Sequence, residues 1–327
     1  MTASAPASTD SSSSSSTAGF AAAPSYALRR PHQSQFIRLR GLNHHVLSWG
    51  SAALATPERP TLVMLHGWMD VGASFQFVVD ALQQDRHVVA LDWRGFGLTE
   101  ASGADSYWFP DYLGDLDALL DVVSPAAAVD LLGHSMGGNV AMSYAGVRPE
   151  RIRRLINLEG FGLPETEPGE APVRLTTWLN ELKSPPQLKT YASVQAVAAR
   201  LMKTNPRLSA AKASWLAPHW SRPVDTDGTV AWHILGDAAH KRSNPVLYRK
   251  AEVTACWERI TAPTLWVEGD STNVRLWWGD RYPRADFEAR LAVVPNLQQA
   301  VLSDAGHMLH HDQPAALAAH IERFLQG

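Results

Sequence analysis

Short, continuous apolar runs recur along the chain and alternate with segments of helical periodicity. Such runs are typical of strands buried on both faces of a parallel sheet. They lie at 61–65, 87–91, 129–132, 155–158, 264–267 and 299–302. The helical patterns lie at 74–82, 112–123, 139–147, 285–291 and 314–325. This alternation predicts an α/β fold with a mostly parallel, doubly wound sheet.

The first part of the chain differs from this pattern. Residues 35–39 and 45–49 alternate between apolar and polar side chains, which predicts an antiparallel hairpin at one edge of the sheet. Residues 1–34 form a tail rich in serine and alanine, with an unbroken serine run at 11–16. Such a composition buries too little apolar area to offset the entropy of ordering the chain. We therefore expect residues 1–34 to be disordered.

The alternation is interrupted once, between 164 and 259, where no convincing buried strand appears. Helical patterns in this stretch lie at 178–182, 194–202, 208–216 and 245–256. The pattern predicts a helical cap, or lid, at 164–259 on a core formed by 35–163 and 260–327. The tryptophans of this insertion either pack it onto the sheet or form an apolar pocket wall. They are Trp178, Trp215, Trp220, Trp232 and Trp257.

The strongest chemical signal is the sequence Gly-His-Ser-Met-Gly-Gly at 133–138, which directly follows an apolar run and precedes a helical pattern. A serine at a tight strand-to-helix turn has strained backbone geometry, and glycines on either side remove side chains that would clash. The helix that follows points its N-terminal amides at the serine oxygen. We predict that Ser135 is a nucleophile.

A base for this nucleophile is expected on the loop after the last strand. That loop reads Ser-Asp-Ala-Gly-His-Met at 303–308 and places His307 at the carboxyl end of the strand. His310 and His311 are rivals, but no further ligand cluster with zinc-like spacing exists, and we expect them on the surface or in a helix cap. His66 precedes the nucleophile in the chain, and we expect it to brace its own loop.

Two backbone amides are candidates for an oxyanion hole. The first predicted parallel strand ends in Leu-His-Gly-Trp-Met-Asp at 65–70, and the loop after this strand supplies one amide in such architectures. We assign that amide to Trp68. The other amide is that of Met136, which directly follows the predicted nucleophile.

The turn after the second parallel strand reads Asp-Trp-Arg-Gly-Phe-Gly at 92–97. Its arginine, Arg94, is able to bind a substrate carboxylate, but a structural role is the simpler interpretation. We expect Asp92 and Arg94 to pair with each other and to fix this turn.

Four motifs now stand in a fixed order along the chain: His-Gly-Trp at 66–68, the turn at 92–97, the serine motif at 133–138 and Ala-Gly-His at 305–307. With them the chain resembles the α/β-hydrolase superfamily over about residues 35–326. Within that superfamily it is similar to esterase-like and serine-hydrolase-like members with a helical cap. The resemblance implies a serine–histidine–acid triad that needs no cofactor or metal. Because the nucleophile is a serine, the epoxide hydrolases and haloalkane dehalogenases of this fold, which use an aspartate, are poor models of the activity.

The resemblance implies that the acid follows the strand at 264–267, three residues beyond Gly269. This chain departs from that pattern, because position 272 is a threonine. Two carboxylates remain as candidates: Asp270 in the same loop, and Glu159 at the end of the earlier strand, where some superfamily members carry their acid. A carboxylate at the end of a buried strand is costly unless it is paired. We therefore favour Glu159 and keep Asp270 as the alternative.

Composition restricts the partners. The chain has a formal net charge of −3, and 19% of its residues are charged, which argues against nucleic acid and against a polybasic membrane anchor. No apolar run approaches the roughly 20 residues needed to span a bilayer. With Cys256 as the sole cysteine, an intrachain disulfide is impossible. This fits a reducing compartment, and we expect a cytoplasmic location.

These observations favour a serine hydrolase that cleaves a carboxylic ester or a related acyl bond through an acyl-enzyme. The alternatives on the same residues are hydrolysis of a carbon–carbon bond or of a lactone. A protein of another class, a ligand-binding or receptor-like member that has lost turnover, is a further alternative, because position 272 lacks the usual acid. The expected partner is a small molecule, apolar or aromatic in character.

Overall fold

The computed structural model describes residues 25–327, so most of the predicted disordered tail, residues 1–24, lies outside it. A mixed sheet of eight strands forms the centre of the described chain, in the order β1-β2-β4-β3-β5-β6-β10-β11. Its strands are β1 (Gln33–Leu39), β2 (Leu42–Trp49), β3 (Leu62–Leu65), β4 (Val88–Leu91), β5 (Val129–His134), β6 (Ile152–Leu158), β10 (Thr264–Gly269) and β11 (Leu297–Leu302). Only the pairings of β2 with β1 and β4 are antiparallel. The predicted α/β fold with a mostly parallel sheet is confirmed.

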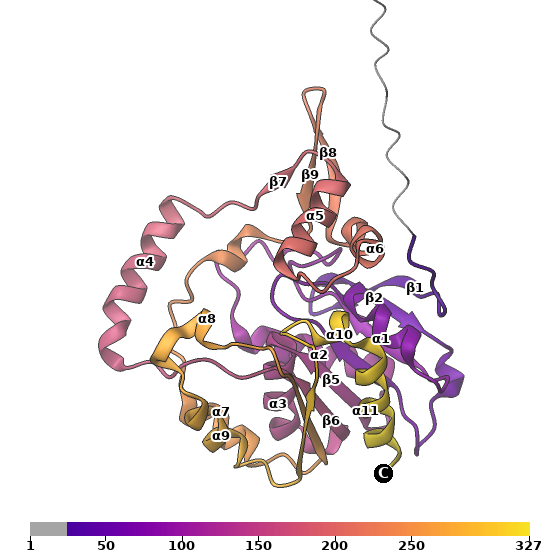
Figure 1. Cartoon of the computed structure of the whole chain (residues 1–327). Coiled ribbons are helices and arrows are strands. Elements are labelled where there is room, and N and C mark those ends of the chain that lie inside the picture. Colours follow the sequence, from indigo (N-terminus) through magenta and orange to yellow (C-terminus); the bar gives the residue numbers. More distant parts are fainter. Residues whose placement is uncertain (1–24) are drawn as a thin grey trace, which may run out of the picture.

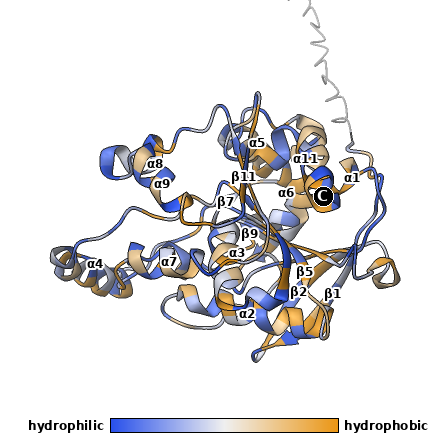
Figure 2. Cartoon of the chain, turned by 90° about the horizontal axis from the view of Figure 1, so that it is seen from below, coloured by the Kyte–Doolittle hydropathy of each residue, from blue (hydrophilic) through white to orange (hydrophobic). Residues whose placement is uncertain are grey.

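Helices cover both faces of this sheet (Figure 1). Residues of β3 alternate between two apolar clusters: Leu62 and Met64 join one, while Val63 and Leu65 join the other. The first cluster includes α1 (Gln76–Ala81) and α11 (Pro314–Gln326), and the second includes α2 (Phe109–Val123), α3 (Met136–Val147) and α7 (Lys250–Trp257). Figure 2 shows hydrophobic and hydrophilic residues mixed along these helices, as expected when one side is buried. None of the helices within 25–327 is long and apolar enough to cross a membrane.

Residues 25–34, which the sequence assigned to the disordered tail, are ordered in the structure. The Asp80 carboxylate on α1 accepts hydrogen bonds from the Tyr26 hydroxyl at 2.9 Å and from the amides of Arg29 and Arg30 at 3.1 and 2.7 Å. Gln76 donates to the Arg30 carbonyl at 2.8 Å. The expectation of disorder is therefore wrong for 25–34, because buried polar groups on α1 take this segment's backbone as their partner.

The insertion at 164–259 contains both helices and strands. Its α-helices are α4 (Ala171–Lys183), α5 (Val194–Thr204), α6 (Ala210–Trp220) and α7 (Lys250–Trp257), and its strands are β7 (Thr190–Tyr191), β8 (Ser221–Thr226) and β9 (Thr229–Ile234). The strands form a small sheet in the order β7-β9-β8, and Figure 1 shows it with α5 and α6 above the carboxyl ends of the main strands. Asp227 and Gly228 join β8 to β9 with φ angles of 52° and 80°. An Asp-Gly pair is the commonest signal for such a hairpin, and the search for buried strands missed it because this hairpin is largely exposed.

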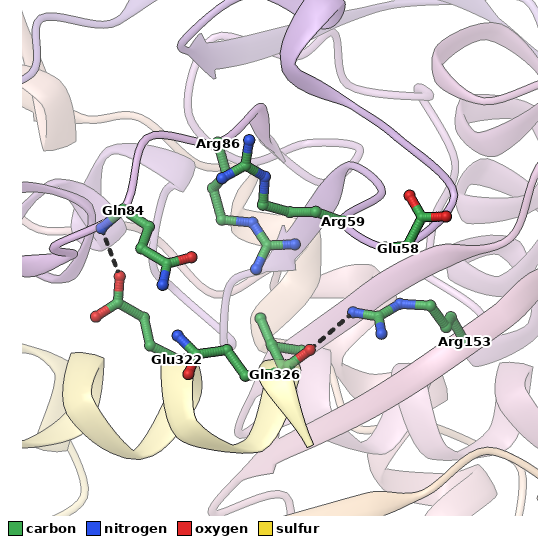
Figure 3. Close-up of a pocket in the computed structure, with 8 residues that line it drawn as sticks. Glu58, Arg59, Gln84, Arg86, Arg153, Glu322 and Gln326 are labelled. Carbon is green, nitrogen blue, oxygen red and sulfur yellow. Dashed lines mark hydrogen bonds between the residues drawn. The ribbon is translucent and has the colours of Figure 1, made fainter.

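A surface pocket of about 150 Å³ lies at the opposite, amino-terminal ends of the parallel strands (Figure 3). Arg86 and Arg153 line it, and both donate to the buried Asp130 carboxylate near the start of β5, each at 2.7 Å. Because ligands of open parallel sheets bind beyond the carboxyl ends of the strands, this pocket does not mark the reaction site.

Candidate active site

Ser135 stands between β5 and α3 in a conformation that few non-glycine residues adopt, with φ 53° and ψ −117°. Two neighbouring glycines make this turn possible. A Cβ at Gly133 would overlap the Gly137 backbone, and one at Gly137 would overlap the Leu65 carbonyl. The Ser135 amide is bound to the Leu158 carbonyl at 2.8 Å, which fixes the turn to β6. The strain is thus held in place by packing, as is common at functional sites.

His307 connects Ser135 to Glu159. Its Nε2 atom lies 3.0 Å from the Ser135 hydroxyl oxygen, and its Nδ1 atom lies 2.8 Å from Glu159 Oε2. The three residues come from the loops after β11, β5 and β6, which all end at the same edge of the sheet. The hydroxyl, the imidazole and the carboxylate therefore form one continuous chain of hydrogen bonds.

The Glu159 carboxylate is buried and fully bonded. Its Oε1 atom accepts a hydrogen bond from the Gly269 amide at 2.7 Å and another from the Thr272 hydroxyl at 2.6 Å. Both donors lie at the end of β10 or in the loop that follows it. Together with His307, they supply the partners that a buried carboxylate requires. Thr272 was noted in the sequence only as a departure from a pattern, and its role as a donor to Glu159 was missed.

Asp270, the alternative acid, makes no hydrogen bond to His307 in the described chain. Its carboxylate accepts hydrogen bonds from the amides of Asp304 and Ala305 at 3.0 and 3.3 Å. These bonds lower the pKa of Asp270 and join the loop after β10 to the loop that carries His307. The structure thus brings Glu159, and not Asp270, to the imidazole.

The two amides predicted to form an oxyanion hole flank Ser135. Met136 is the first residue of α3, so its N–H has no acceptor within the helix. Trp68 follows Gly67, where an added Cβ would lie 3.1 Å from the Cβ of Ser135. Neither the Met136 nor the Trp68 amide donates a hydrogen bond to another group in 25–327. Both amides are therefore free to donate to a ligand.

His66 braces its loop, as the sequence predicted. Its Nε2 atom accepts a hydrogen bond from the Trp93 amide at 3.0 Å, so its Nδ1–H donates to the Gly67 carbonyl at 2.7 Å. The Trp93 indole also donates to the His66 carbonyl at 2.9 Å. Complete burial lowers the pKa of His66, which keeps the ring neutral and in this tautomer.

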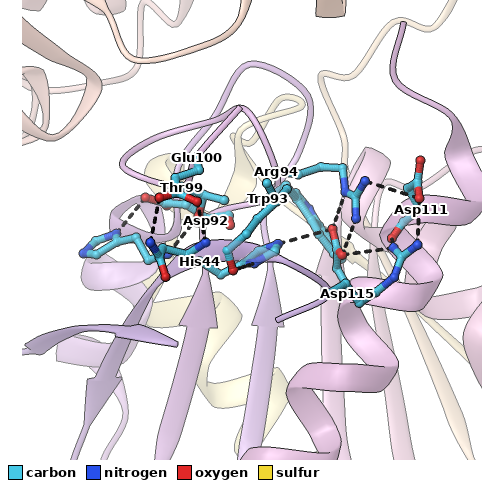
Figure 4. Close-up of polar contacts among 12 residues, drawn as sticks. His44, Asp92, Trp93, Arg94, Thr99, Glu100, Asp111 and Asp115 are labelled. Carbon is cyan, nitrogen blue, oxygen red and sulfur yellow. Dashed lines mark hydrogen bonds and ion pairs between the residues drawn. The ribbon is translucent and has the colours of Figure 1, made fainter. Parts of the chain in front are cut away.

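Asp92 and Arg94 do not pair with each other, which corrects the sequence expectation (Figure 4). Arg94 binds Asp115 of α2 through two nitrogens at 2.5 and 2.6 Å. Asp92 instead contacts His45 Nδ1 at 2.7 Å and accepts from the Gly72 amide at 2.7 Å. The two residues are separated by Trp93, and each side chain has its partner on another element: His45 of β2 for Asp92 and Asp115 of α2 for Arg94. Arg94 is thus committed to a buried ion pair.

His310 and His311 are buried, whereas the sequence placed them on the surface or in a helix cap. They lie on α10 (Leu309–Asp312), a single turn between the His307 loop and α11. His134 lies beside them, and its Nε2–H donates to the His307 carbonyl at 2.8 Å. Burial, together with the neighbouring histidines, holds the pKa of His134 well below its ordinary value. The residue before the nucleophile therefore supports the backbone of the residue predicted to be its base.

The aromatic ring nearest the imidazole is Trp277, which was not among the predicted site residues. Its ring centroid lies 4.5 Å from that of His307, with the rings roughly perpendicular. Trp277 belongs to α8 (Arg275–Trp278), outside the predicted cap. Within the insertion, Trp257, the last residue of α7, is buried in the core, and Trp220 donates to Asp70 at 3.2 Å. These two tryptophans pack the insertion onto the core.

Comparison with known proteins agrees with this architecture. The family model described as the alpha/beta hydrolase fold matches residues 60–314. The cis-3-alkyl-4-alkyloxetan-2-one decarboxylase of Shewanella oneidensis is 24% identical over 310 residues, covering 90% of this chain and 89% of that protein. The 3-hydroxybutyrate-oligomer hydrolase of Cupriavidus necator is 28% identical over 285 residues, covering 83% and 88%. The solved structure of the thioesterase domain from the curacin biosynthetic pathway superposes with a TM-score of 0.76 at 29% identity, covering 90% of this chain and 99% of that one. The chain therefore belongs to the alpha/beta hydrolase fold family.

Proposed function

We propose that this protein is a serine hydrolase that cleaves a carboxylic ester or a related acyl bond. The observation that carries the proposal is the position of His307, whose two ring nitrogens lie 3.0 Å from the Ser135 hydroxyl and 2.8 Å from Glu159. An imidazole held in this way accepts a proton on one nitrogen while the carboxylate stabilises the charge that develops on the ring.

The reaction has two steps. The Ser135 oxygen attacks the substrate carbonyl carbon, its proton passes to His307 Nε2, and the carbonyl electrons move onto the oxygen. The amides of Trp68 and Met136 stabilise this oxyanion, each contributing about 3 kcal/mol to the transition state. The bond to the leaving group then breaks, and His307 returns the proton to the departing oxygen. Water repeats the sequence on the acyl-enzyme and releases the acid.

Two relatives support acyl transfer as the reaction class. One is named as the hydrolase of a 3-hydroxybutyrate oligomer, and the other is a thioesterase domain. The two comparisons cover 83% and 90% of the present chain, respectively. Ester and thioester hydrolysis share the tetrahedral oxyanion and differ in the leaving group. The Ser135 turn, the His307 imidazole and the amides of Trp68 and Met136 serve both reactions equally.

Exposed apolar side chains on segments that approach Ser135 and His307 favour an apolar acyl or alcohol group. Trp68 and Trp277 are 51% and 45% exposed. Trp277 contacts the His307 ring, and Trp68 follows Gly67, which lies against Ser135. Next to Trp277, Leu276 is 81% exposed. Exposed large apolar side chains gathered around a polar centre are typical of a surface that holds an apolar ligand.

A lactone is the second candidate substrate. The Shewanella oneidensis relative is named for an oxetan-2-one, which is a four-membered cyclic ester, and this comparison spans 90% of the chain. Attack of Ser135 on such a ring opens it to a 3-hydroxyacyl-enzyme without losing a separate leaving group. The same histidine and amides then serve deacylation.

A fluorophosphonate probe tests the proposal directly. We expect labelling of the full-length chain at Ser135, hydrolysis of p-nitrophenyl esters, and loss of both in Ser135→Ala. Ser271→Ala is the matched control, because the Ser271 hydroxyl contacts only the exposed Asp270 carboxylate. Correctly folded protein that is neither labelled nor active would instead support the ligand-binding alternative. A series of ester chain lengths and a β-lactone then identify the preferred acyl group.

A further inference from the structure

Three buried side chains that the proposed mechanism does not use converge behind the His307 loop. They are Asp70 from the loop after β3, His134 at the end of β5 and His310 on α10, and each is at most 4% exposed. One ligand atom of each lies within 4.8 Å of the other two. We propose that these three residues bind one Zn²⁺ or a similar borderline divalent ion.

His134 has the ring nitrogen that a metal needs. Its Nε2 must carry the proton, because it bonds to the His307 carbonyl at 2.8 Å and a carbonyl only accepts. Its Nδ1 atom then holds a free lone pair, and in the described chain this buried atom has no hydrogen-bond partner. Histidines that bind metals commonly donate their other N–H to a backbone carbonyl, which fixes the ring and the tautomer.

Asp70 is oriented in the same manner. Its Oδ1 atom accepts hydrogen bonds from the Val71 amide at 2.9 Å, from the Trp220 indole at 3.2 Å and from the Ser74 hydroxyl. Its Oδ2 atom has no hydrogen-bond partner within residues 25–327, although it is buried. One oxygen thus holds the carboxylate in position and leaves the other directed at the cluster.

His310 completes the set. Neither of its ring nitrogens has a hydrogen-bond partner in the part of the chain that the structure describes. Its Nε2 atom lies 3.7 Å from Asp70 Oδ2, too far for a hydrogen bond but close to the separation of two ligands on one tetrahedral ion. Its ring centroid is 4.3 Å from that of His134. The three ligand atoms, which all lie within 4.8 Å of one another, therefore have to move closer together to contact one ion.

The donor set indicates the kind of ion. Two imidazole nitrogens and one carboxylate oxygen suit zinc and its neighbours among the transition metals, whereas calcium and magnesium prefer oxygen ligands. Three protein ligands leave one tetrahedral position for water. His311 also lies beside His310, with its Nε2 atom unbonded among 25–327, and adds a fourth nitrogen near the cluster.

The ion's expected effect is on stability and not on the chemical step. Ser135 and the His307 ring are already hydrogen-bonded to each other. The cluster meets the site through His134, which precedes Ser135, donates to the His307 carbonyl and lies with its ring centroid 4.8 Å from that of His307. An ion at this point joins the loop after β3, the end of β5 and α10. It therefore holds the His307 loop against the sheet without contacting the reacting atoms.

Cobalt substitution tests the proposal independently of any hydrolytic activity. The full-length chain, without a histidine tag and stripped with a chelator, is titrated with Co²⁺ and then with Zn²⁺. We expect one ion per chain, the intense visible bands of tetrahedral Co²⁺, their displacement by Zn²⁺ and a rise in melting temperature. Asp70→Asn, which keeps the side-chain shape, and His310→Gln should each weaken binding at least tenfold. His320→Asn, on α11 away from the cluster, should bind as the parent does.

Two outcomes would overturn the proposal. In the first, the metal-free and fully folded parent chain binds no more Co²⁺ than the Asp70→Asn variant does. In the second, tetrahedral Co²⁺ persists in both cluster variants, which would place the ion at other histidines. If His310→Gln does not fold, Asp70→Asn alone decides between these results. The amide keeps one acceptor oxygen for the Val71, Ser74 and Trp220 donors and replaces the free carboxylate oxygen with an NH2 group, which does not bind a metal.

Discussion

Thr272 donates its hydroxyl to Glu159 Oε1 at 2.6 Å, joining two residues that stand 113 positions apart in the sequence. The bond links the loop after β10 to the end of β6, which are neighbouring strands of the sheet. Thr272 stands where the sequence pattern predicts an acid. It donates instead to Glu159, the carboxylate that follows the neighbouring strand β6. The two loops build a single carboxylate site.

Thr272→Val should lower kcat about tenfold. The substitution keeps the shape of the side chain and removes one hydrogen bond to a charged acceptor, which contributes about 1.5–3 kcal/mol. Part of that loss falls on the orientation of Glu159 toward His307, and about 1.4 kcal/mol corresponds to one factor of ten. Ester hydrolysis under saturating substrate measures the change. Thr272→Ser, which retains the hydroxyl, should recover most of the rate, and equal rates for both variants would contradict this role.

Glu159→Gln should reduce kcat by about three to four orders of magnitude with a small effect on folding. The amide places an N–H where Nδ1 of His307 now donates, so the ring loses the acceptor that fixes its tautomer. Asp270→Asn is the matched control, because its carboxylate faces the Asp304 and Ala305 amides. Steady-state kinetics of the two variants, with circular dichroism to verify folding, decides the assignment. The opposite ranking would assign the acid to Asp270.

The main features of the fold could be predicted because buried parallel strands read as continuous apolar runs, and each predicted run falls on a strand of the main sheet. The strained turn at Ser135 could be predicted in the same way, because a strand, a glycine-flanked turn and a helix are all local in sequence. The choice between Glu159 and Asp270 is different in kind. It depends on which loop reaches the imidazole, and sequence neighbours carry no information on that distance.

Other features could not be predicted because polar residues reveal their burial only in three dimensions. His310 and His311 read as surface residues, yet their turn is enclosed between α1, α11 and the loop after β3. Trp277 escaped attention because it belongs to a four-residue helix with no periodicity to detect. The hairpin of β8 and β9 did carry a signal, the Asp227-Gly228 pair, and a search for turns would have found it.

Asp80→Ala should lower the free energy of unfolding by about 2–3 kcal/mol. The change removes the acceptor of three hydrogen bonds from Tyr26, Arg29 and Arg30, and bonds to a charged group are the stronger kind. A chain that starts at residue 35 should show a similar loss relative to one that starts at 25. Urea unfolding measures both differences. Asp85→Ala is the control: its ion pair with Arg30 is exposed, and we expect a change within about 0.5 kcal/mol.

The stability of the folded chain should decrease as the pH falls below about 6.5, because two histidines at the junction of the insertion and the core are held neutral. Burial lowers the pKa of both His240 and His219 to about 4. His240 is stacked between Phe96 and Tyr107, at centroid distances of 3.7 and 3.6 Å. Its Nε2–H donates to the Arg94 carbonyl at 3.0 Å. Protonating either ring places a positive charge in a largely buried environment, which costs free energy.

The direction follows from proton binding. In the unfolded chain a histidine has a pKa near its ordinary 6.5, so between that value and about 4 the unfolded state binds protons that the folded state does not. The contribution of the two neutral histidines to the free energy of unfolding is fully present above about pH 6.5. It decreases as the pH falls and is lost below about pH 4. Urea unfolding near pH 7 and pH 4.5 should show a loss of about 1–2 kcal/mol for each histidine. His240→Phe keeps a ring between Phe96 and Tyr107 but cannot titrate, so its loss over the same interval should be smaller. An equal loss in this variant would show that the pH dependence arises elsewhere in the chain.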